Sequence, residues 1–293
     1  MSLSPSYPLW ITGHFTVPLK SPDGDSIHFV SDTQLPPLLK THRDGSISLR
    51  LIAIDAPETH YAPRGASVTL KQPTEWPLNA TKALLQFCGY SSFILNSNQR
   101  IVECPTPPQR GFALLIQPDK YSRVLSWVFR GELPFARTPP QTLPSSWIEQ
   151  SANGQLLKKG FVYPYFSESI NPEQTSTCQE LVQDAQKKSL GIWSKDTSQH
   201  FDYTDPSPLT QTQLIWPLLF RRLMTWHTLP PPRPTWSEFS RQNKDLVRLK
   251  NLPQWIPLNN LLTISQGQMS LLVPIQNIII KSTLPNKPGA PYR

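Results

Sequence analysis

Short hydrophobic stretches with strand-like periodicity dominate the first half of the chain. From Ile47 to Ile54, residues 47, 49, 51 and 53 form one side of the pattern and residues 48, 50, 52 and 54 the other. Because side chains alternate between the two faces of a strand, this pattern predicts a strand that is largely covered on both faces. Further short strands are expected at residues 11–17, 27–30, 93–95, 101–104, 112–116 and 124–129.

Helical patterns follow the strands. Residues 77–87, 147–158 and 174–188 are expected to be helices, the first with Pro77 in its first turn and Gly89 just beyond its end. Strands at short spacing with a few helices predict a mainly β protein with α-helices, in the α+β class, built as a small barrel with helical cover. The 33 prolines, which favour stiff extended connections, argue against a helical bundle.

The composition of the chain changes near residues 202–208. We therefore expect one domain over residues 1–203 and a C-terminal extension of unknown fold over residues 204–293. The extension contains four of the nine tryptophans, which indicates a folded unit with tryptophans in its core. A helix is expected at residues 237–249, and apolar runs occur at 270–273 and 275–280.

The net charge of the chain indicates which class of molecule it could bind. The chain carries 28 Lys and Arg against 20 Asp and Glu, a formal net charge of +8, which attracts polyanions such as nucleic acid. A generic basic surface is the alternative. The three cysteines match no metal-ligand spacing, and no secretory signal or membrane-spanning run is visible, so we expect a cytoplasmic protein that does not associate with membranes.

Three polar blocks contain the groups that phosphodiester hydrolysis requires. They are Asp-Gly-Asp-Ser at residues 23–26, Arg-Leu-Ile-Ala-Ile-Asp-Ala-Pro-Glu at 50–58 and Lys-Tyr-Ser-Arg at 120–123. Hydrolysis needs a base that activates water, a hard cation held by carboxylates, and guanidinium groups that neutralise the phosphate charge. Each block taken alone is more typical of a turn, a helix cap or a structural ion pair.

The order of these blocks resembles the staphylococcal nuclease family. Two later segments extend the similarity, Leu-Leu-Lys-Lys-Gly-Phe-Val-Tyr-Pro-Tyr at residues 156–165 and Asp-Ala-Gln-Lys-Lys-Ser-Leu-Gly-Ile-Trp at 184–193. Five blocks in one order are far more specific than any one of them. The resemblance implies a five-stranded OB-fold barrel flanked by three helices, and a nuclease that cuts single-stranded DNA or RNA.

The resemblance also implies a metal centre and a base. Asp25 and Asp55 would hold one divalent metal ion, typically Ca²⁺, together with the backbone carbonyl of Ala56. Glu58 would act as the general base or orient the attacking water. Ala56 replaces a threonine of the best-known members, which leaves a carbonyl ligand unaffected.

The remaining roles concern the substrate. By the same resemblance, Arg50 and Arg123 would bind the scissile phosphate and stabilise the charge that develops on it. Tyr121, Tyr163 and Tyr165 would line the nucleotide pocket.

Some features depart from the family pattern and leave alternatives open. Ser122 replaces a glycine, and segments 31–43, 96–111 and 130–145 look longer than in compact members. The chain could instead be a non-catalytic module that binds nucleic acid or protein, and its extension could contact a protein partner. In that extension, Arg221 and Arg222 are interpreted as a solvated helix face or, alternatively, as contacts to a phosphate backbone.

Overall fold

The first part of the chain forms a closed barrel of five strands. The structure is a computed structural model that describes residues 8–17, 20–63, 67–96, 100–134, 140, 142–243 and 245–281. Around the barrel the strand order is β1-β2-β3-β8-β7, and β3 closes it by pairing in parallel with β8. The bounds are β1 Leu9–Thr16, β2 Ser26–Ser31, β3 Ile47–Leu51, β7 Gln109–Pro118 and β8 Val124–Arg130.

The alternating pattern of the sequence explains why these strands form a barrel. In β3, Ile47, Leu49 and Leu51 are buried while the residues between them are partly exposed. The same alternation holds in β1. One face of each strand therefore fills the barrel interior, and the predicted fold class is confirmed.

Helices cover one side of the barrel. They are α1 Glu75–Phe87, α2 Ser145–Gln150, α3 Ala152–Lys158 and α4 Pro172–Lys187. The helix expected at residues 147–158 is in fact two helices, because Ser151 has an extended backbone with ψ 158°. The Ser151 hydroxyl accepts a hydrogen bond of 3.0 Å from the amide of Gly154 and so caps the start of α3.

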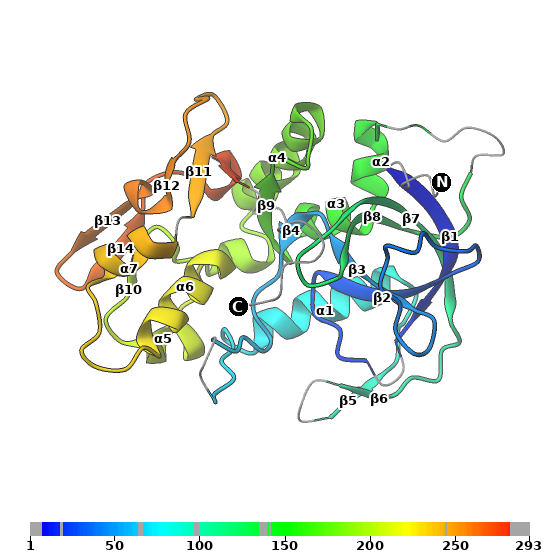
Figure 1. Cartoon of the computed structure of the whole chain (residues 1–293), viewed down its shortest axis with the longest axis horizontal. Coiled ribbons are helices and arrows are strands. Elements are labelled where there is room, and N and C mark those ends of the chain that lie inside the picture. Colours follow the sequence, from blue (N-terminus) through cyan, green and yellow to red (C-terminus); the bar gives the residue numbers. More distant parts are fainter. Residues whose placement is uncertain are drawn as a thin grey trace.

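A second sheet joins the barrel region to the C-terminal part of the chain. Its strand order is β12-β11-β15-β9-β4, with β4 Ala53–Asp55, β9 Tyr163–Ser167, β11 Leu246–Leu249, β12 Ile256–Pro257 and β15 Ile278–Ile280. Ala53 has a φ of 71°, and there the chain turns from β3 into β4, so the single strand predicted over residues 47–54 is in fact two strands in different sheets. In Figure 1 the barrel lies on the right and the C-terminal elements on the left, with β4 and β9 between them.

The C-terminal part contains three helices and a three-stranded sheet. The helices are α5 Pro206–Gln211, α6 Pro217–His227 and α7 Trp236–Asn243, and the sheet has the order β10-β14-β13. The remaining bounds are β5 Ile94–Leu95, β6 Ile101–Glu103, β10 Phe201–Asp202, β13 Leu262–Ser265, β14 Gln268–Leu271, and the 3-10 turns η1 Gly191–Ser194, η2 Leu258–Leu261 and η3 Ile275–Asn277. Within the described ranges, no helix has the length and apolar character required to cross a membrane.

One expected helix of this part is wrong in its second half. The helix predicted over residues 237–249 ends at Asn243, and Leu246–Leu249 form strand β11 instead. Val247 pairs with Ile280 of β15, so a strand more than thirty residues away decides the conformation of this segment. Local periodicity carries no information about such a partner.

Buried hydrophobic residues form two cores. The first fills the barrel and the space beneath its helices. The second lies among α5, α6, α7 and the C-terminal strands. It includes three of the four tryptophans of the extension, Trp216, Trp226 and Trp236, whereas the fourth, Trp255, is partly buried and packs against the first core. Tyr163 and Ile192, which precede residue 204, also belong to this second core.

Candidate active site

A cavity of about 540 Å³ lies where the barrel, β4, β9 and helix α6 meet. Eight of the nine residues singled out from the sequence line it, which are Asp25, Arg50, Asp55, Ala56, Glu58, Tyr121, Arg123 and Tyr165. The fold thus brings together side chains that are up to 140 positions apart in the sequence. Leu218, Arg221 and Arg222 of the C-terminal part line the same cavity.

Asp25 is held by the turn that precedes β2. The backbone amide of Leu51 donates a 2.8 Å hydrogen bond to the Asp25 carbonyl, and Ser26 Oγ donates one of 2.5 Å to Asp23 Oδ1. Asp25 Oδ2 accepts a 2.8 Å hydrogen bond from the amide of Ala56. The Asp-Gly-Asp-Ser turn therefore aims the Asp25 carboxylate at the end of β4.

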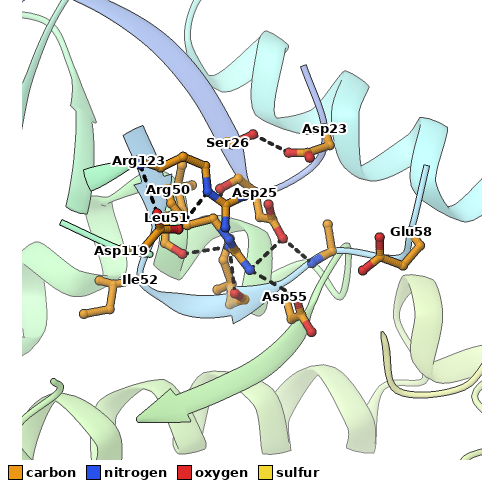
Figure 2. Close-up of polar contacts among 12 residues, drawn as sticks. Asp23, Asp25, Ser26, Arg50, Leu51, Ile52, Asp55, Glu58, Asp119 and Arg123 are labelled. Carbon is orange, nitrogen blue, oxygen red and sulfur yellow. Dashed lines mark hydrogen bonds and ion pairs between the residues drawn. The ribbon is translucent and has the colours of Figure 1, made fainter. Parts of the chain in front are cut away.

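Arg50 lies between the two aspartates that the sequence suggested as metal ligands. Its Nη2 is 3.0 Å from Asp25 Oδ2 and 3.0 Å from Asp55 Oδ1. Figure 2 draws Arg50 between these two carboxylates. Its Nη1 donates to the carbonyls of Leu51 and Ile54, both at 3.0 Å. In this structure the Nη donors of Arg50 are therefore engaged by the protein itself, which is the structural ion pair left open above.

Asp55 is the most deeply buried carboxylate of the site, with a side chain that is 2% exposed. Besides Arg50, it contacts Arg221 of helix α6, whose Nη2 is 2.8 Å from Asp55 Oδ2 and whose Nη1 is 3.2 Å from Oδ1. Two guanidinium groups thus flank this carboxylate. Buried carboxylates are stable only when they are paired and hydrogen-bonded, and Asp55 meets that condition.

Glu58 lies apart from the Arg50 group, on the loop that follows β4 (Figure 2). Its Oε1 accepts a short hydrogen bond from Arg221 Nη1. Its backbone amide donates to Gln72 Oε1 at 3.0 Å. The sequence did not place Arg221 in this site. Its signal is the Arg221-Arg222 pair, for which a solvated helix face is the commoner interpretation and a contact to a phosphate backbone the alternative, whereas the structure places it against Asp55 and Glu58.

Arg123 is the more accessible arginine of the site, with a side chain that is 30% exposed. Its Nε donates a 2.8 Å hydrogen bond to Asp119 Oδ2. Its guanidinium lies 5.4 Å from the ring of Tyr121, an exposed aromatic residue. Ser122 between them has a φ of 64°, a conformation that favours the glycine found there in the family pattern.

The two other tyrosines suggested from the sequence have different surroundings. Tyr165 lines the cavity beside Asp55. Tyr163 is buried in the second core, where its hydroxyl donates a 2.8 Å hydrogen bond to Asp196 Oδ1. Tyr163 and Tyr165 are two positions apart in β9 and so project from the same face, but only Tyr165 reaches the cavity, because Tyr163 is buried in the second core and bonded to Asp196.

Burial and mutual repulsion shift the titration of the acidic groups. Burial raises the pKa of Asp25 well above its usual range, and the neighbouring carboxylates of Asp23 and Asp55 act in the same direction although Arg50 opposes them. Burial also raises the pKa of Glu58, although the charge of Arg221 opposes that shift. Desolvation is therefore the main reason why the pKa values of both carboxyl groups are raised.

Carboxylate oxygens of the kind found in this site are ligands that a hard cation accepts. Asp25 Oδ2 and Asp55 Oδ1 both lie 3.0 Å from Arg50 Nη2, so in this structure the guanidinium occupies the point that the two oxygens face. Among the described residues, no group of three or more His, Cys, Asp or Glu is arranged to hold a metal. Two carboxylates would thus need a backbone carbonyl and water to complete the coordination, a mixture that Ca²⁺ accepts.

Comparison with known protein families gives a match to part of the chain. The family model described as Staphylococcal nuclease homologue matches residues 48–195, about half of the chain. This range contains Arg50, Asp55, Glu58 and Arg123, whereas Asp25 precedes it and Arg221 follows it. No curated protein matches the chain.

Proposed function

The chain belongs to the staphylococcal nuclease family, and on this premise we propose that it is a metal-dependent nuclease that hydrolyses the phosphodiester bonds of DNA or RNA. The observation that carries the proposal is the convergence of Asp25, Asp55, Glu58 and Arg123 on one cavity. These residues come from a turn, a strand end and two loops. A structural role for each alone would not require that they meet.

Glu58 is the proposed base. Its Oε1 is bonded to Arg221, and Oε2 accepts no hydrogen bond from the described residues, so one oxygen remains for a water molecule. A carboxylate beside a bound phosphate removes the proton of water as the water oxygen attacks phosphorus. Asp25, Asp55 and the Ala56 carbonyl would hold Ca²⁺, which when bound neutralises charge on the phosphate.

Arg123 is the proposed phosphate-binding group. It uses Nε for Asp119, and its two Nη atoms donate no hydrogen bond within the described part of the chain. A guanidinium edge of this kind binds two phosphate oxygens at once and stabilises the charge that grows during attack. Tyr121 beside it presents an exposed ring on which a base can stack.

Arg50 has a different proposed role in the resting site. Since its Nη donors hold Asp25, Asp55 and two carbonyls, it first fixes the two carboxylates. It contacts the phosphate only after some of these bonds are exchanged. Tyr165 forms the wall of the cavity beside Asp55.

A second candidate function is a binding module without catalysis. The observation that favours it is the engagement of Asp55 and Glu58 by Arg221, which leaves fewer free oxygens than an open nuclease site. Such a module would bind strands through Arg123 and Tyr121 without cleaving them.

The test is hydrolysis of fluorescently labelled single-stranded DNA and RNA, with Ca²⁺ and then with a chelator. We expect cleavage that the chelator abolishes and that Arg123→Ala reduces by about 10²–10³-fold, as for loss of one group that stabilises transition-state charge. Arg110→Ala is the matched control, because Arg110 forms surface ion pairs with Asp32 and Glu132 outside the cavity.

Glu58→Gln separates the two candidates. For a nuclease, it lowers cleavage by about 10²–10⁴-fold and preserves strand binding, since the amide keeps the shape of the side chain but cannot take a proton. Strand binding without cleavage by the unaltered protein, with any divalent metal, would establish the binding module instead.

A further inference from the structure

Helix α6 places the side chain of Arg221 against the loop that carries Glu58. Its buried face, which includes Leu219, Phe220 and Leu223, packs in the second core. Arg221 lies at the edge of that face, with a side chain that is 22% exposed, and it reaches Asp55 and Glu58. No residue of the barrel makes a comparable contact with Glu58 in the described structure.

The loop that carries Glu58 has further contacts with the same part of the chain. The side chain of Gln72 is completely buried and bridges the two regions: its Oε1 accepts from the Glu58 amide at 3.0 Å, and its Nε2 donates to the Ile215 carbonyl at 2.7 Å. The Tyr61 hydroxyl lies 2.6 Å from Thr225 Oγ1 of α6. Besides backbone hydrogen bonds within its own region, such as that from the Gln72 amide to the Glu58 carbonyl, this loop is thus held by contacts to Ile215 and Thr225, which lie outside the region that matches the family.

We propose that Arg221 is a positioning residue of the nuclease site, which holds the Glu58 carboxylate in place for water activation and keeps it beside Asp55. This inference rests on the proposed function. The C-terminal part would thus supply a side chain that the nuclease site requires for full activity.

The geometry distinguishes this role from direct phosphate binding. Arg221 donates through Nη1 to Asp55 and Glu58 and through Nη2 to Asp55, so its fork is already occupied by two carboxylates. The two like charges would repel each other without a cation between them. A planar guanidinium donates hydrogen bonds to both carboxylates in fixed directions, and the ammonium group of a lysine does not reproduce that geometry.

The test compares the full chain with Arg221→Met and Arg221→Lys. Methionine keeps an unbranched side chain and removes the charge. We expect kcat to fall by about 100-fold for Met, the order of loss caused by a misplaced catalytic group, with partial recovery for Lys. KM and the affinity for a labelled oligonucleotide in chelator should remain unchanged, because Arg221 does not contact the strand.

Arg233→Met is the matched control. Arg233 belongs to the same part of the chain, but it stacks on Trp226 at 4.1 Å and does not line the cavity. We expect its kcat to equal that of the unaltered protein. Hydrogen exchange of the Glu58 amide supplies a readout independent of activity, and it should become faster in Arg221→Met only.

Combination with Glu58→Gln shows whether Arg221 acts through the base. If it does, adding Arg221→Met to Glu58→Gln lowers kcat little further, because both changes remove one function. Additive losses would overturn the proposal in favour of general damage to the fold. Higher activity of Arg221→Met would overturn it in favour of a blocking role. An unaltered protein that never cleaves would refute the proposed function as a whole.

Discussion

The barrel and the C-terminal part contribute to the cavity in different ways. The barrel supplies Asp25, Arg50 and Arg123 from short motifs that carry their chemistry in the local sequence. The C-terminal part supplies Arg221 from a helix whose sequence contains no motif. The difference shows that short sequence motifs can identify which chemical groups a site contains. The orientation of those groups depends on packing against segments that are distant in the sequence.

The largest expected effect comes from removing the C-terminal part. A chain of residues 1–203 would expose Tyr163, Ile192 and Phe201 of the second core and would leave β9 without β15. The free energy lost with these contacts should exceed the free energy of unfolding of a typical domain, about 5–15 kcal/mol. We therefore expect that circular dichroism shows no cooperative thermal unfolding of the truncated chain. A sharp transition near that of the full chain would show that the expected domain boundary at residue 203 separates two independent units.

A matched pair of core substitutions compares the two regions more finely. Leu49 in the barrel and Leu219 in α6 are both completely buried. We expect Leu49→Ala and Leu219→Ala each to lower the free energy of unfolding by about 2–5 kcal/mol in urea titrations. If the two regions unfold together, each variant shows one transition. Two separate transitions in Leu219→Ala would contradict that coupling.

A pH-dependent effect is expected from the barrel alone. Burial, together with the charges of Lys20 and His42, lowers the pKa of His28 to about 4, although Asp44 opposes the shift. The unfolded chain, with an ordinary histidine pKa of about 6.5, then binds more protons between these two values. Stability should therefore fall as the pH decreases from about 6.5 toward 4.

His28→Gln tests this expectation, because glutamine keeps a polar side chain that does not titrate. The variant should show a weaker loss of thermal stability over the same pH interval than the unaltered protein. An equal slope in both proteins would assign the acid sensitivity to other groups.

The smallest expected effect concerns the loop beside Arg123. Ser122 has a φ of 64°, so Ser122→Gly should relieve strain and raise the free energy of unfolding by up to about 1 kcal/mol. Gly45→Ala is the opposite control: its φ is 78° and no atom lies within 4 Å of the added Cβ, so only backbone strain changes. The free energy of unfolding of that variant, measured in the same urea titrations, should be lower by about 1–2 kcal/mol. Equal stabilities would show that these turns relax.

The barrel could be predicted because its information is local. The alternation at Ile47, Leu49 and Leu51 marks a buried face, although it also predicts cover on the opposite face, where Ser48 and Arg50 are partly exposed. Turns such as Asp44-Gly45 separate the strands. Most of the residues suggested for the site line the cavity for the same reason, since they lie at strand ends and turns of that barrel. Tyr163 does not, because its side chain is enclosed in the second core, where its hydroxyl is bonded to Asp196.

The C-terminal part resisted prediction because its partners are distant. Residues 246–249 form a strand through pairing with β15. Arg221 points toward the cavity because Asp55 and Glu58, which belong to a distant segment of the chain, bind its guanidinium. A pair of arginines on a helix looks the same whether it faces water or a buried carboxylate. Only the fold distinguishes the two.

The parallel pairing of β15 with β9 has a consequence for the timing of biosynthesis. Residues 48–195 leave the ribosome before Arg221, and well before Ile278–Ile280. At roughly 5–20 residues per second, the barrel segment exists for several seconds without these partners. During that interval β9 is an exposed edge strand and Glu58 lacks its guanidinium, so the nascent chain has to avoid aggregation before its site is complete.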